Sequence, residues 1–153
     1  MPSAQFQQVI EHLAKIKIKK LELTFASCKE LYPDQIANFF GSLSIFEFLE
    51  EFRLEALSQA IETCYLLDAA VAFAGSLRRW KRIRLLSLKL VIAKDYDFEC
   101  FKVLAEAIKS LKNLQSLFFS WNAKSIIKRA KEQEYFASIL PSLPYLSFLE
   151  ILV

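Results

Sequence analysis

The chain has little of the chemistry on which most enzymes and metal sites depend. Its 153 residues include only two glycines, one histidine and three cysteines. Gly41 and Gly75 are isolated, so neither a phosphate-binding P-loop nor a dinucleotide fingerprint can be formed. The single histidine, His12, cannot make a two-histidine metal site, and no Cys-x-x-Cys pair predicts a zinc site. We therefore expect no metal, no cofactor and no catalytic residue.

Other scarcities indicate the class of protein and its compartment. Gly and Pro together number six, too few for a linker-rich or disordered chain, and hydrophobic residues make up 54%. No apolar run reaches the roughly 18 residues that cross a bilayer, and the first five residues lack the layout of a secretory signal. Three cysteines, an odd number, argue against a disulfide framework. We expect one cytoplasmic domain, in a reducing compartment, over residues 1–153.

An apolar triplet that recurs five times dominates what the chain does contain. The triplets are Ile18-Leu21-Leu23, Leu49-Phe52-Leu54, Ile83-Leu86-Leu88, Leu114-Leu117-Phe119 and Leu146-Leu149-Ile151. Their middle residues, called anchors below, follow one another at steps of 31, 34, 31 and 32 residues. A period of about 20 to 50 residues is typical of stacked repeats, because one unit cannot bury its apolar face alone. The units span roughly 1–27, 28–59, 60–93, 94–124 and 125–153.

Each unit is expected to form a helix followed by a short strand. Apolar residues recur 13 and nine positions before most anchors, on one helical face, while the anchor and the residue two after it share a strand face. Twelve before the anchors, on the same helical face, lie Val9, Phe40, Ala74, Ala105 and Ala137. The expected helices are 5–16, 33–44, 66–79, 98–111 and 126–140. The expected strands are 18–24, 50–55, 84–90, 115–120 and 147–152.

This alternation predicts an α/β fold in which a parallel sheet forms one face and helices form the other. Gly41 and Gly75 fall inside the expected helices, where they either permit close helix contact or are tolerated weak points. Cys28, Cys64 and Cys100 occupy different positions in their units, so we interpret them as small buried hydrophobic residues.

The fourth unit carries a more specific pattern over residues 104–122. It contains Leu-Ala-x-x-Ile in its helix, at 104–108, and an LxxLxLxxN strand signature that ends at Asn122. This unit resembles a leucine-rich repeat of the ribonuclease-inhibitor-like class. The other units keep the apolar skeleton without the asparagine. The resemblance implies a solenoid of about five degenerate helix–strand units, in which the exposed sheet face is the usual binding surface.

The exposed sheet face is the candidate site for a protein partner. Residues one before, one after and three after each anchor point away from the core. Aromatic residues on such a face are candidate interface anchors, which gives Phe118 and Phe148 the greatest weight. The candidate partner-binding residues are Arg53, Glu55, Leu85, Ser87, Lys89, Ser116, Phe118, Ser120, Phe148, Glu150 and Leu152.

The final strand predicts a second contact. The chain stops at Val153 with no capping helix, and an apolar edge strand pairs readily with another chain. Three explanations stay open: a partner covers the edge, the chain associates with itself, or the sequence is a piece of a longer repeat protein. The favoured function is a non-enzymatic protein-interaction module, serving as a scaffold or assembly subunit.

A basic cluster supports the alternative function. Arg78, Arg79, Lys81 and Arg82 fall at one expected helix-to-strand turn, where they could contact RNA as part of a ribonucleoprotein. The net charge of only +3 argues against that function. A recognition segment of a larger regulator or of a bacterial effector is the third possibility. Most other charges face opposite charges in the neighbouring unit: Lys19 with Glu50, Lys20 with Glu51, Glu22 with Arg53, and Glu47 with Lys81.

Overall fold

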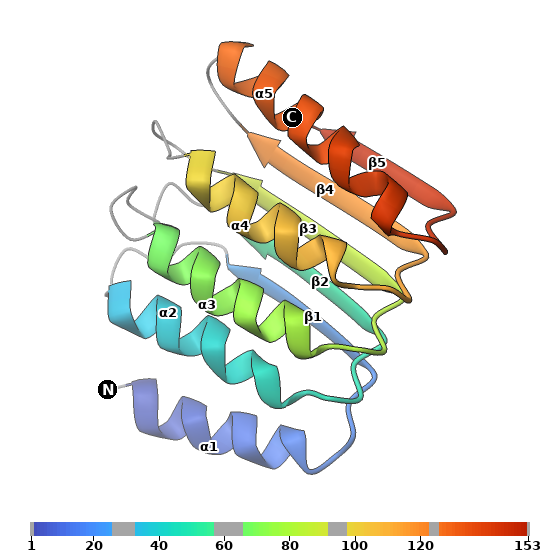
Figure 1. Ribbon diagram of the computed structural model, residues 1–153. Coiled ribbons are helices and arrows are strands. Elements are labelled where there is room, and N and C mark those ends of the chain that lie inside the picture. The colour runs from blue at the N-terminus through green and yellow to red at the C-terminus, as the bar shows by residue number, and fades with distance from the viewer. Residues whose placement is uncertain (1, 26–32, 57–65, 92–97, 123–125, 153) are drawn as a thin grey trace.

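The computed structural model describes residues 2–25, 33–56, 66–91, 98–122 and 126–152, and helices alternate with strands along them (Figure 1). The helices are α1 (Pro2–Ala14), α2 (Pro33–Ser42), α3 (Leu66–Arg79), α4 (Phe98–Lys109) and α5 (Ile126–Ile139). The strands are β1 (Lys20–Phe25), β2 (Glu51–Ala56), β3 (Leu85–Val91), β4 (Ser116–Asn122) and β5 (Phe148–Leu152). Short 3-10 helices, η1 (Leu43–Ile45) and η3 (Leu140–Ser142), follow α2 and α5. Every expected helix and strand is present, with ends within three residues of the prediction.

The strands form one parallel sheet in the order β1-β2-β3-β4-β5, which is also their order in the chain. The helices cover one face of this sheet and leave the other uncovered (Figure 1). Each anchor pairs with the anchor of the next unit, from Leu21 through Phe52, Leu86 and Leu117 to Leu149. The α/β class and the parallel sheet are therefore confirmed, and equal positions of successive units lie side by side.

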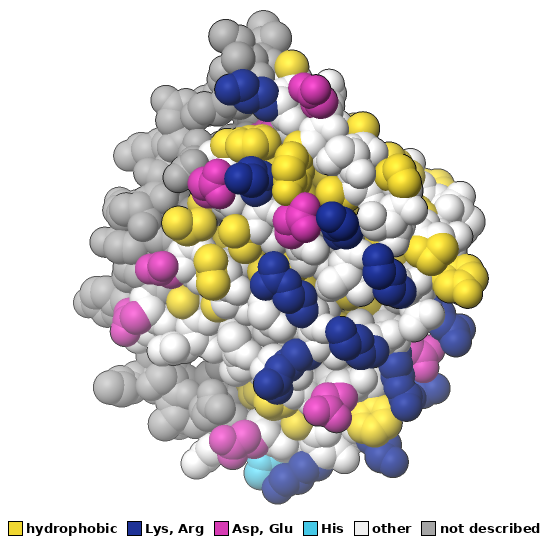
Figure 2. All heavy atoms as spheres, in the orientation of Figure 1, with side chains coloured by type: hydrophobic (Ala, Val, Ile, Leu, Met, Phe, Trp, Pro, Cys, Tyr) yellow, Lys and Arg dark blue, Asp and Glu magenta, His cyan; other side chains and the backbone are white. Residues whose placement is uncertain are grey.

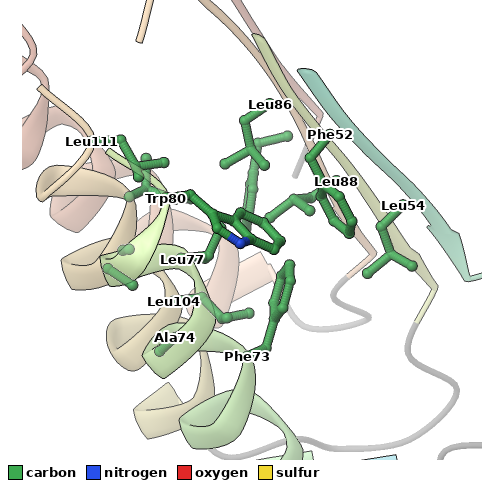
Figure 3. Packing of buried hydrophobic residues seen from close by; sticks show 14 of the residues in the cluster. Phe52, Leu54, Phe73, Ala74, Leu77, Trp80, Leu86, Leu88, Leu104 and Leu111 are labelled. Atoms are coloured by element: carbon green, nitrogen blue, oxygen red, sulfur yellow. The ribbon is translucent and has the colours of Figure 1, made fainter. Parts of the chain in front are cut away.

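The core fills the space between the sheet and the helices. In the three central strands, the anchors and the residues two after them are at most 1% exposed. Figure 3 shows Phe73 and Trp80 pointing from the helix side toward Phe52 and Leu88 of the sheet. The ring centroids of Phe52 and Trp80 lie 4.7 Å apart. Burying each such side chain contributes about 1.5–3 kcal/mol, so this layer supplies most of the driving force for folding.

The two end strands are less well covered, because each has a neighbour on one side only. Leu21 and Leu23 of β1 are half-buried, and the anchor Leu149 of β5 is 39% exposed. The corresponding anchors Leu86 and Leu117 are completely buried. The repeat pattern therefore predicts core burial correctly for units with two neighbours and overstates it at both ends.

The predicted helical face is wrong in α1 and, at one position, in α5, where Phe136 is buried as expected. Val9 was expected to face the core, but it is 53% exposed and Ile10 is buried in its place. Ala137 is also exposed, whereas Ala74 is buried. The face shifts because α1 and α5 each pack against a single helix. The turn after α1 also differs from the later ones: Lys17 adopts a left-handed φ of 50°.

The expectation of close helix contact at the glycines is wrong as well. A Cβ atom placed on Gly41 or on Gly75 would meet no other heavy atom within 4 Å. Neither residue has a positive φ. These two positions are the tolerated weak points of their helices, which is the second of the two interpretations of the sequence.

The predicted charge ladder is present in part. Lys19 Nζ lies 3.2 Å from Glu50 Oε1, and Lys20 Nζ lies 3.6 Å from Glu51 Oε2. Glu22 and Arg53 are direct neighbours in the pairing of β1 with β2. Exposed pairs of this kind contribute at most about 1 kcal/mol each, so they favour the observed neighbours without fixing the fold.

Side chains of one unit also cap the helix of the unit before it. A helix leaves its last four carbonyls without intrahelical partners. At the end of α2, Ser76 of α3 donates from Oγ to the carbonyl of Phe40 at 2.6 Å. The indole Nε1 of Trp80 donates to the carbonyl of Leu43 at 3.1 Å. The second bond lies where the helices lead into their strands, in the segments 15–19, 43–50, 78–84, 109–115 and 140–147, which we call the turn edge.

Candidate protein-interaction surface

The uncovered side of the sheet, the exposed sheet face, holds all eleven predicted partner-binding residues. Alternation along β3 illustrates the arrangement: Leu86 and Leu88 are buried, whereas Leu85 and Ser87 are half-buried and Lys89 is exposed. Successive strand residues point to opposite sides of a sheet, so the second set lies on the side without helices. The prediction of which strand residues avoid the core is confirmed.

The half of this face formed by β1, β2 and β3 is charged. Lys20 pairs with Glu51, and an ion pair that the sequence analysis missed joins Glu55 of β2 to Lys89 of β3. The signal was available, because Glu55 and Lys89 occupy the same position in successive units. Positive and negative side chains therefore alternate on this half of the face. A partner would not meet a surface of one charge sign there.

The half formed by β4 and β5 carries the aromatic and aliphatic side chains of this face, with Glu150 opposite Phe118. The rings of Phe118 and Phe148 lie 4.8 Å apart at an interplanar angle of 34°. Phe148 is 46% exposed and Leu152 is 59% exposed. In the strand pairing, Ser116 is opposite Phe148 and Ser120 is opposite Leu152. An apolar centre beside hydroxyl groups is the composition typical of a protein–protein interface.

The four predicted nucleic-acid contacts lie on a different surface. Arg78 and Arg79 end α3, and Lys81 and Arg82 follow them, so all four belong to the turn edge. All four residues are exposed. The structure therefore separates the two candidate surfaces that the sequence suggested: the exposed sheet face and the turn edge do not share these residues.

One aromatic residue organises part of the turn edge. The guanidinium of Arg82 lies 4.9 Å from the centre of the Phe48 ring, and Lys17 Nζ lies 5.3 Å from it. Cations at such distances from an aromatic ring are attracted to its π-system. The sequence analysis missed this cluster, although Lys17, Phe48 and Arg82 all stand four residues before their anchors and therefore lie in neighbouring units.

The single histidine and the buried cysteine occupy ordinary structural positions. His12 is exposed, and its Nδ1 donates to the carbonyl of Gln8 in the same helix at 3.1 Å. Cys100 is buried, as expected for a small hydrophobic residue, while Cys28 and Cys64 lie outside the described residues. Within the residues that the structure describes, no group of three or more His, Cys, Asp or Glu could hold a metal ion.

Two acidic side chains of the helix layer have altered ionisation. Glu132 of α5 is buried and its carboxylate oxygens have no hydrogen-bond partner among the described residues, and burial raises its pKa to about 7. Glu106 accepts a 2.7 Å hydrogen bond from the Tyr135 hydroxyl, which lowers the pKa of Glu106. Burial, and then that same bond, raise the pKa of Tyr135 to about 12. None of these three residues belongs to the exposed sheet face or to the turn edge.

Comparison with known proteins adds no family. No family model and no curated protein matches this chain. Across the described ranges, no helix combines the length and the apolar character needed to span a membrane.

Proposed function

We propose that this chain is a leucine-rich-repeat solenoid of five units that acts as a non-enzymatic protein-interaction module, as a scaffold or assembly subunit. Three features support the repeat assignment: the strands pair in chain order, the anchors pair with anchors, and Ser76 and Trp80 cap the preceding unit. In stacked-repeat proteins each unit contacts only its neighbours, and the sheet face without helices is free to bind.

The observation that carries the functional proposal is the Phe118–Phe148 pair on the exposed sheet face. Two aromatic rings packed together at 4.8 Å with one of them 46% exposed are suited to anchor a partner. The serines beside them supply hydrogen bonds, and the charged half of the face supplies pairs such as Glu55–Lys89 that can exchange partners. A protein surface with apolar groups at its centre and mixed charges to one side fits this arrangement.

The free edge of β5 extends the proposed contact. Among the described residues β5 pairs only with β4, and its Leu149 and Leu152 remain 39% and 59% exposed. An open strand edge can accept another strand through main-chain hydrogen bonds. The partner that covers Phe118 and Phe148 is proposed to cover this edge as well; a second copy of the chain is the competing occupant.

Affinity capture of the tagged chain from its native cell, at low and at high salt, tests the proposal. Apolar contacts survive high salt, whereas phosphate contacts weaken steeply as salt rises. Phe118→Asp should abolish capture of the partner while the circular dichroism stays unchanged. Val71→Asp is the matched control, because Val71 is 52% exposed on α3 in the helix layer. Equal capture by both variants would contradict the proposed site.

The alternative functions make different predictions. RNA contact through Arg78, Arg79, Lys81 and Arg82 would use the turn edge, so partners would be lost together as the salt concentration rises. A recognition segment of a larger regulator or of a bacterial effector would be revealed by a gene that continues beyond Val153.

A further inference from the structure

The turn edge holds an unusual share of the chain's positive charge. It contains ten Lys or Arg and two Glu, a net charge of +8, whereas the whole chain carries +3. The cations are Lys15, Lys17, Lys19, Arg78, Arg79, Lys81, Arg82, Arg84, Lys109 and Lys112. In Figure 2, Lys and Arg side chains gather at the lower right, the side where Figure 1 places the helix-to-strand turns, and others lie over the helices at the centre. The rest of the molecule is correspondingly acidic.

Internal pairing neutralises little of this charge. Within the described residues, only Lys19 and Lys109 among the ten have a carboxylate oxygen within 4.0 Å, from Glu50 and Glu106 respectively. Compensation of helix dipoles accounts for few of the ten cations, since a cation is favoured only in the last turn of a helix. Arg78, Arg79 and Lys109 hold such positions, and the remaining seven do not. The excess charge is thus available to an anionic partner.

Large apolar side chains project from the same edge. Ile16 is 67% exposed, Ile45 is 37% exposed and Tyr145 is 64% exposed. They come from the first, second and fifth units, so they stand on both sides of the arginines of the third unit. Aliphatic tips beside cations suit insertion at the boundary between lipid headgroups and acyl chains, and Tyr favours that same boundary. Two of these three tips, Ile16 and Ile45, are aliphatic and cannot stack on nucleic-acid bases, which favours a membrane over a single-strand RNA as the partner.

The edge is also held together between units. The main-chain N–H of Glu50 donates to the carbonyl of Lys19 at 2.7 Å, and Arg84 donates in the same way to Glu50 at 2.8 Å. Asn113 Nδ2 donates to the carbonyl of Lys81 at 2.8 Å. The cations and apolar tips are therefore presented by connected turns, along a line about 19 Å long if strands are spaced at 4.8 Å.

We propose that the turn edge is a peripheral docking surface for an anionic lipid membrane. Arg79, Lys81 and Lys112 would lie over acidic headgroups, and Ile16 and Tyr145 would enter the interface on either side of them. This orientation leaves the exposed sheet face free to bind protein. The inference does not depend on the proposed function, because it uses a different surface.

Sedimentation of the full chain with lipid vesicles tests the charge. Vesicles of phosphatidylcholine alone should bind weakly, and vesicles that also contain phosphatidylserine should bind in a salt-dependent manner. Lys81→Glu should weaken the second interaction about thirtyfold, since it changes the charge by two and each charge near such a surface contributes about 1 kcal/mol. Lys131→Glu, on an exposed position of α5, changes the net charge equally and should have little effect. Equal losses in both variants, or no binding to phosphatidylserine vesicles, would overturn the inference.

A second comparison separates membrane from RNA. Ile16→Ser should reduce vesicle binding several-fold, whereas Val71→Ser, at an exposed position of α3, should leave it unchanged. Binding of a single-stranded RNA oligonucleotide should be weak, and the oligonucleotide should not displace the protein from vesicles. Displacement by RNA, together with vesicle binding that Ile16→Ser leaves intact, would assign the turn edge to nucleic acid instead.

Discussion

The hydroxyl of Ser76 in α3 donates a 2.6 Å hydrogen bond to the main-chain carbonyl of Phe40 in α2. Ser76 is 1% exposed, so the bond lies in the interior. The carbonyl belongs to the last turn of α2, which the helix itself cannot satisfy. The end of one helix is therefore completed by a side chain that arrives 36 residues later in the chain.

Ser76→Ala tests this cap. The substitution removes this buried hydrogen bond, and we expect the free energy of unfolding to fall by about 0.5–1.5 kcal/mol in urea denaturation. Ser138→Ala is the control, since Ser138 donates to the carbonyl of Tyr135 within its own helix and is exposed. The control should change stability by less than about 0.5 kcal/mol. Equal losses of stability in the two variants would show that the hydrogen bond between the units stabilises the fold no more than an exposed bond within one helix.

Trp80→Phe removes a second link between the same two units. The variant loses the hydrogen bond from Nε1 to the carbonyl of Leu43 and leaves a cavity beside Phe52. We expect a loss of about 2–4 kcal/mol. Trp121, the other tryptophan, is completely buried and reports unfolding by fluorescence in the variant. A loss below about 1 kcal/mol would show that the bond and the packing are both replaceable.

Glu132 should make stability depend on pH. Burial raises its pKa to about 7 from the ordinary 4.5, so between these pH values the folded state keeps a proton that the unfolded chain has lost. The free energy of unfolding should therefore fall as pH rises from 4.5 through 7 and then level off, by up to about 3 kcal/mol. Glu132→Gln should remove this dependence, measured by urea denaturation at both ends of the range. Glu134→Gln, at an exposed position, should retain it.

Gly75→Ala should stabilise the protein. A new Cβ meets nothing within 4 Å, the residue lies inside α3, and alanine is favoured over glycine in a helix. We expect a gain of about 0.5–1 kcal/mol in the free energy of unfolding, measured by thermal or urea denaturation. A loss of stability would indicate that the position is more crowded than the structure shows.

The sequence predicted the elements well because the repeat is redundant. Phe52, Leu86 and Leu117 hold the same place in three copies, so a weak local signal in one unit was corrected by the others, and all three anchors are completely buried. The open side of the sheet followed from the same register, because strand residues alternate. The positions of Phe118 and Phe148 on it could therefore be predicted before their 4.8 Å separation was known.

The prediction failed where a residue lacks one of its two neighbours. Val9 and Leu149 match the repeat, yet both are exposed, because each belongs to a unit at an edge of the described sheet. The cluster of Lys17, Arg82 and Phe48 was missed for another reason: its residues fall in turns, where apolar periodicity carries no information. Comparing equal positions between units, rather than following one strand or helix at a time, would have found it.

The chain-order sheet has a mechanical consequence. Because the strands pair in chain order, with β1 and β5 at opposite edges of the described sheet, a tension applied to the two ends passes through the four strand pairs in series and is not shared among them. The molecule should instead peel from an end, and the end strands, whose anchors are the least buried, should detach at the lowest force. A protein stretched between two attachment points would then lengthen in steps of about thirty residues, yielding gradually where a sheet with interleaved strands would break at once.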